Sequence, residues 1–108
     1  MKLDRFEEVI KKHIAKIDHL LLVKAKEYAS DEDRLHNFNK GAQITGECRE
    51  KVLFSFALKH LISVMDIIDA HNKNGTLPNQ ATLDEKFGDL GAYIAILYSS
   101  FQDKIDNS

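Results

Sequence analysis

A wide apolar face at helical spacing is the strongest constraint on the fold of this chain. Within residues 46–72, apolar side chains recur every three or four positions and cover about half of a helical wheel. Lys59, Ser63 and Asp66 line up on the opposite side. Such a wide apolar face needs neighbouring helices on more than one side. We therefore expect residues 46–72 to form the central helix of a helical domain, with Thr45 as its N-cap.

Two further stretches show the same spacing. Residues 1–28 mix apolar and charged side chains as an amphipathic helix does, and residues 82–104 open with a capping box of Thr82 and Glu85. Residues 29–44 are rich in Asp, Asn and Gly, which predicts a loop with a short helix. The predicted fold is all-α: one domain, built as an antiparallel bundle of three long helices plus a short helical loop, completed by dimerisation.

The expectation of a dimer comes from a stripe of small side chains in the last helix. The stripe consists of Gly88, Gly91, Ala92, Ala95 and Ser99. Small residues in a row let another helix approach closely. A second subunit is one source of that helix, so a homodimer is the expected assembly.

Composition narrows the classes of function. The 108 residues suffice for about one domain, and the formal net charge of -2 provides no field that would gather nucleic acid or an anionic membrane. Cys48 is the single cysteine, which excludes an internal disulfide and multi-cysteine metal motifs. No apolar run reaches the roughly 18 residues of a membrane span, and the N-terminus does not resemble a signal peptide. A cytoplasmic protein is expected.

Acidic side chains in the last helix suggest a metal site. Glu85 and Asp89 lie four residues apart, so they project from one helix face, and Tyr93 continues the line. Carboxylate oxygens of this kind suit magnesium. The alternative is structural, with Glu85 completing the capping box and Asp89 pairing with a lysine. Glu47 and Glu50 fit the start of a helix better than a metal site.

The polar strip of the central helix also has two interpretations. Lys59, Ser63 and Asp66 can present an ammonium and a carboxylate to one ligand, or they can form a structural ion pair. His60 points into the apolar face, where a histidine is more often a hydrogen-bonded core residue than a catalytic base.

The polar groups of the loop can either cap helices or contact a ligand. Arg34 and Lys40 suit a phosphate group, and Asn37 adds a hydrogen-bonding amide between them. Glu27 falls at the edge of an apolar face, so its carboxylate either points partly inward or reaches water.

Four groups of residues resemble phage and prophage proteins of the nucleotide-modification-associated type: Glu27-Tyr28, Asp33 to Phe38, Lys59-His60 with Ser63 and Asp66, and Asp84 to Asp89 with Tyr93. The last group is also similar to the closing segment of the all-α nucleoside triphosphate pyrophosphatases, the MazG-like and dimeric dUTPase group.

This resemblance implies a nucleotide site with magnesium. Asp66, Glu85 and Asp89 would hold the metal against the phosphates while a water attacks phosphorus. Arg34 and Lys59 would face the phosphates. The other nucleotide-binding candidates are Asn37, Lys40, His60 and Tyr93, with Glu27 as an additional ligand.

Two functions from different classes follow. The first is a phage-type, magnesium-dependent protein that binds a nucleotide and possesses or lacks hydrolase activity. The second is a non-enzymatic helical interaction or assembly protein that uses the stripe of small residues to bind a partner helix.

Overall fold

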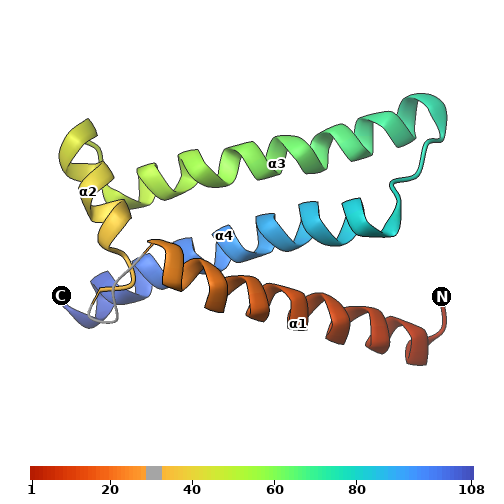
Figure 1. Cartoon of the computed structure of the whole chain (residues 1–108), viewed down its shortest axis with the longest axis horizontal. Coiled ribbons are helices and arrows are strands. Elements are labelled where there is room, and N and C mark those ends of the chain that lie inside the picture. Colours follow the sequence, from red (N-terminus) through yellow and green to blue (C-terminus); the bar gives the residue numbers. More distant parts are fainter. Residues whose placement is uncertain (29–32) are drawn as a thin grey trace.

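A computed structural model describes residues 1–28 and 33–108, without the side chains of residues 24, 25, 27 and 28 (Figure 1). Its helices are α1 (Leu3–Tyr28), α2 (His36–Thr45), α3 (Arg49–Asn74) and α4 (Gln80–Asp106). The described ranges contain no strand, so the all-α class is confirmed. None of the helices in these ranges combines the length and apolar character that crossing a membrane requires.

The long helices form one layer with α4 in the middle (Figure 1). α4 packs against α3 and against α1, and α2 packs against α3. α3 runs antiparallel to α4, whereas α1 runs parallel to it (Figure 1). The parallel pairing follows from the contacts: Lys12 pairs with Asp84, and Ile17 lies against Gly91 further along. The central position therefore belongs to α4 and not to the helix with the wide apolar face.

Two members of the stripe of small residues on α4, Gly88 and Gly91, are covered by α1 of the same chain. A Cβ added at Gly88 would lie 3.1 Å from Leu20 Cδ1, and one added at Gly91 would lie 2.5 Å from Ile17 Cδ1. The absence of side chains at these positions thus allows α1 to pack closely. The helix that this stripe predicted is present, but it is supplied within the chain.

The boundary between α2 and α3 differs from the prediction. Gly46 adopts the left-handed conformation with φ +75° and ends α2. Cys48 is extended at the N-cap position, so α3 starts at Arg49 and not at residue 46. The Thr45 hydroxyl, expected to cap α3, donates to the Gly41 carbonyl oxygen at 2.9 Å. It belongs to the last turn of α2.

The start of α4 also lies earlier than the capping box indicated. Asn79 is the N-cap, and its Oδ1 accepts the backbone N–H of Thr82 at 2.8 Å. Pro78 precedes this cap. Thr82 therefore lies inside the first turn and receives the capping bond.

A small core lies between α2, α3 and α4. The buried members of this cluster are Phe38, Val52, Leu53, Ala57 and Tyr93. The core ends beside the first turn of α3, where charged side chains replace apolar ones. This position places a polar pocket at the end of the layer.

Candidate functional site

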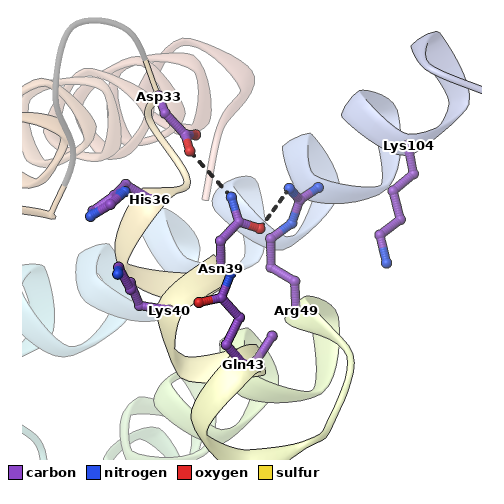
Figure 2. Close-up of a pocket in the computed structure, with 8 residues that line it drawn as sticks. Asp33, His36, Asn39, Lys40, Gln43, Arg49 and Lys104 are labelled. Atoms are coloured by element: carbon purple, nitrogen blue, oxygen red, sulfur yellow. Dashed lines mark hydrogen bonds between the residues drawn. The ribbon is translucent and has the colours of Figure 1, made fainter.

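A pocket of about 510 Å³ opens where α2, the start of α3 and the C-terminal part of α4 meet (Figure 2). Its volume lies within the range of small-molecule sites, roughly 300–1,000 Å³. Mostly polar and charged side chains line it: Asp33, His36, Asn39, Lys40, Ala42, Gln43, Arg49 and Lys104. This composition suits a charged ligand better than an apolar one.

Arg49 fixes the inner wall of the pocket and is only 8% exposed. Its Nε donates to Ser100 Oγ at 2.7 Å, and its Nη1 donates to Asn39 Oδ1 at 3.2 Å. Its Nη2 donates to the Ser100 carbonyl oxygen at 2.9 Å and to Asp103 Oδ2 at 3.0 Å. One guanidinium thus connects α2, α3 and α4.

Glu50 follows Arg49 and is also buried. Its carboxylate accepts hydrogen bonds from the Ser100 hydroxyl and from Lys104 Nζ, the latter at 2.5 Å. Burial opposes ionisation of this carboxyl. The bonds from Lys104, from Ser100 and from the backbone N–H of Glu50 outweigh that effect and lower the pKa from its ordinary 4.5 to about 2. Glu50 is therefore a carboxylate at neutral pH.

A second chain of hydrogen bonds holds the turn before α2. Asp33 Oδ1 accepts the backbone N–H of Leu35 at 2.9 Å, and its Oδ2 accepts Asn39 Nδ2 at 3.2 Å. Asn39 lies between Asp33 and Arg49 and bonds to both (Figure 2). The amide of Asn39 thereby sets the distance between the turn and the buried guanidinium.

His36 and Lys40 are the accessible basic groups of the pocket. They lie one turn apart on α2 and extend from the same side of it (Figure 2). Neither has an ion pair or a side-chain hydrogen bond to any residue that the structure describes. By contrast, the cations of Arg49 and Lys104 are already paired with carboxylates. Lys40 is therefore the positive charge of the pocket that carboxylates neutralise least, and an incoming anion would bind there.

The residues predicted to bind phosphate do not all lie together. Lys40 lines the pocket. Asn37 is exposed in the first turn of α2, and Arg34 is exposed in the turn before it. Lys59 lies ten residues beyond Arg49 on α3, about 15 Å along the helix axis. Lys59 therefore belongs to another part of the molecule.

Three other predicted residues meet between the middle parts of α3 and α4. The His60 and Tyr93 rings stack with their centroids 4.8 Å apart, and His60 Nδ1 lies 3.8 Å from Asp89 Oδ2. Phe56 stacks on Tyr93 at 6.3 Å, and Phe38 contacts Phe56 edge-on at 5.7 Å. The imidazole thus closes a row of aromatic rings, which matches the structural interpretation of His60.

The predicted magnesium ligands are not brought together in one chain. Asp89 faces His60, whereas the exposed Glu85 lies 3.6 Å from Lys86 Nζ. Asp66 is two positions after the buried Val64, which places it about 160° around α3 from that residue. It lines a different hollow, of about 220 Å³, beside Pro78.

Among the side chains that the structure describes, no group of three His, Cys, Asp or Glu could hold a metal ion. The set of Asp66, Glu85 and Asp89 therefore does not fit magnesium within the chain. The Glu27 side chain, the additional candidate, lies outside the described residues.

The sequence reasoning missed the buried network of Arg49, Glu50 and Ser100. A signal for Arg49 existed, because a cation in the first turn of a helix is unfavourable unless carboxylates compensate it. Ser100 follows the buried Tyr93 by seven residues, which places it on the same side of α4. The positions of both residues in the sequence therefore indicated that each side chain needs a polar partner.

Comparisons with known proteins return no match: no family model, no curated protein and no solved structure is similar to this chain.

Proposed function

We propose that this protein binds a nucleotide or another phosphate-bearing small molecule in the pocket between α2, α3 and α4. The observation that carries the proposal is the pair of accessible bases His36 and Lys40, which lack an anionic partner among the described residues. They border a pocket with a fixed, hydrogen-bonded inner wall. A preorganised wall lowers the entropic cost of binding.

The charged side chains of the pocket have different roles in this proposal. Lys40 offers three ammonium N–H donors, and His36 offers ring nitrogens that donate when protonated. Four of the five N–H donors of Arg49 already have acceptors, so Arg49 can give at most one to a ligand. Lys40 is therefore the principal phosphate contact in this proposal, and Arg49 positions the surrounding groups.

The proposal covers binding and does not include a magnesium-dependent step. The residues that the phage-protein resemblance implies as ligands do not fit the metal within one chain. The resemblance still supports a nucleotide as the phosphate-bearing molecule, because one of its segments runs from Asp33 to Phe38, and Asp33 and His36 line the pocket.

A panel of phosphate compounds tests this proposal by thermal unfolding. Inorganic phosphate, pyrophosphate and nucleoside mono- and triphosphates are compared, each with and without magnesium. A ligand at 100 times its Kd stabilises the folded state by about 2.7 kcal/mol, which raises Tm by about 10 °C in a domain of this size. At least one compound should produce such a shift.

Variants then locate the site. Lys40→Ala should weaken binding at least tenfold without lowering the Tm of the free protein, since Lys40 is exposed. Lys11→Ala removes an equally exposed lysine from α1 and should leave binding unchanged. The proposal is wrong if no compound shifts Tm, if both variants bind alike, or if Lys59→Ala abolishes binding while Lys40→Ala does not.

A further inference from the structure

Each long helix carries a stripe of apolar side chains that stays partly exposed. On α3 the stripe follows the alternating four- and three-residue spacing of a helix-packing seam, and its members are 36–56% exposed: Phe54, Leu58, Leu61, Met65 and Ile68. On α4 the same spacing holds for Leu83, Phe87, Leu90, Ile94, Leu97 and Phe101. On α1 the exposed members are Leu3, Phe6, Ile10 and Ile14.

The stripe of α4 lies between its two neighbours. At about 100° per residue, Gly88, which contacts α1, and Tyr93, which contacts α3, lie on opposite sides of α4. Leu83, Ile94 and Phe101 fall together in the gap between those two sides. They therefore point out of one face of the layer.

The stripes of the flanking helices lie on that same face. On α3, Leu61 and Met65 are about 90° around the helix from Leu53 and Val64, the buried residues next to α4. α3 is antiparallel to α4, so its residues progress around the axis in the opposite sense when both helices are seen from one end. α1 is parallel to α4 but lies on its other side. The opposite direction of α3 therefore turns its exposed stripe toward the same face as the stripe of α4. The opposite position of α1 does the same for the stripe of α1.

We call this surface the apolar face and define it by exposed residues of the three stripes: Leu3, Ile10 and Ile14 of α1, Phe54, Leu61, Met65 and Ile68 of α3, and Leu83, Ile94 and Phe101 of α4. It includes large exposed apolar side chains from all three long helices, and exposed apolar surface of this kind marks an interaction site. None of the residues that line the basic pocket belongs to it.

The accessible surface area of the chain indicates how much surface a partner would have to bury. Its accessible surface is 7892 Å², whereas a compact monomer of 12.3 kDa exposes about 6,100 Å². Its radius of gyration is 16.2 Å, against about 13 Å for a compact domain of this length. Each chain thus exposes roughly 1,800 Å² more than a self-sufficient monomer.

We propose that a second copy of this chain covers the apolar face, so that two layers stack into a symmetric homodimer. Covering the excess on both chains buries roughly 3,600 Å², which lies in the range of obligate homodimers, about 2,000–5,000 Å². An apolar face is complementary to itself, as a two-fold interface requires. The dimer therefore forms through this face and not through the stripe of small residues, in which α1 already covers Gly88 and Gly91.

The mass of the protein in solution tests this proposal. Light scattering after size exclusion at about 10 µM should give twice 12.3 kDa. Tm should rise with protein concentration, because association stabilises the folded state by mass action. A 12.3 kDa species with a Tm independent of concentration would overturn the proposal and assign the face to a different partner.

Two substitutions identify the face. Leu61→Glu and Ile94→Glu place a charge in its centre, and each should weaken dimerisation at least 100-fold. Ile44→Glu is the matched control, because Ile44 is exposed on α2, which contributes no residue to the apolar face as defined. If either face variant unfolds, its helicity by circular dichroism and its mass are measured over a series of protein concentrations. The proposal then requires that the helicity of that variant increase with protein concentration. A dimer that survives both face variants, or an Ile44→Glu variant that alone dissociates, would contradict the proposal.

Discussion

Glu50→Gln removes the charge at the centre of the buried network without changing the size of the side chain. In the native chain this carboxylate accepts from the Ser100 hydroxyl and from Lys104 Nζ. A glutamine can still accept from Ser100 with its carbonyl oxygen. Its amide N–H groups would face the Lys104 ammonium, however, so two donors would meet where a charge pair had been.

The pKa of Glu50 sets the size of the effect. A decrease from 4.5 to about 2 corresponds to about 3 kcal/mol of stability at pH 7. The Lys104 side chain is 51% exposed, so solvent screening reduces this figure to about 2 kcal/mol. We expect Glu50→Gln to lower the free energy of unfolding by that amount at pH 7.

The same linkage predicts how the effect depends on pH. The folded-state pKa lies below the unfolded one, so the stabilisation is complete above about pH 4.5 and is lost as the pH falls toward 2. By pH 3 more than half of the difference between wild type and variant should have disappeared. The variant has no carboxyl at this position and lacks this component.

Urea unfolding at pH 7, 5, 4 and 3 measures this difference, at one protein concentration throughout. Urea carries no charge and leaves the ion pairs unscreened. Glu47→Gln is the control, because Glu47 is exposed just before α3, and it should change stability by less than about 0.5 kcal/mol at every pH. A Glu50→Gln variant as stable as wild type at pH 7, or a difference that stays constant down to pH 3, would refute the reasoning.

Five further substitutions test the end of α3, the start of α4 and the packing of α4 against α1. Asn79→Ala should cost about 1 kcal/mol of stability by removing the N-cap, and Thr82→Ala should cost less, as chemical denaturation of both will show. Gly75→Ala should cost about 1 kcal/mol because Gly75 has φ +70° at the end of α3; a stabilised variant would contradict the left-handed conformation. Gly91→Val should destabilise by about 1–3 kcal/mol through overlap with Ile17, and Ile17→Ala should relieve part of that loss in the double variant.

Periodicity was sufficient to predict the long helices, and their class is confirmed. It was not sufficient to identify their neighbours. The apolar pattern of α3 requires cover but does not say whether α1, α2 or a second chain provides it. The small residues Gly88 and Gly91 likewise predicted a close helix, and only the structure shows that α1 supplies it. Which helix covers a face depends on the packing of the whole chain.

The helix ends were displaced for local reasons. Gly46 can adopt a left-handed conformation that ends α2, so Thr45 became the end of one helix and not the cap of the next. Asn79 took the capping position because its side chain reaches the N–H of Thr82. In both places a neighbouring residue could also cap the helix, and the pattern of residues alone does not choose between them.

The candidate site was predictable only in its accessible part. Lys40 stood out as a basic residue in a polar segment, and it lines the pocket. The inner wall depends on Arg49 reaching Ser100, which is 51 residues away in the sequence. A contact between residues so far apart leaves no pattern in the local sequence. A single chain does not bring Asp66, Glu85 and Asp89 together, because their positions depend on the relative rotation of α3 and α4, which the sequence does not give.

Amide chemical shifts during a titration with a phosphate compound test the central claim most directly. In ¹⁵N-labelled protein, the ligand that raises Tm most should produce saturable shifts at His36, Asn39, Lys40 and Arg49, with the middle parts of α3 and α4 little changed. Shifts centred on His60 and Tyr93, or no saturable shift with any phosphate compound, would contradict the claim that the basic pocket is the binding site.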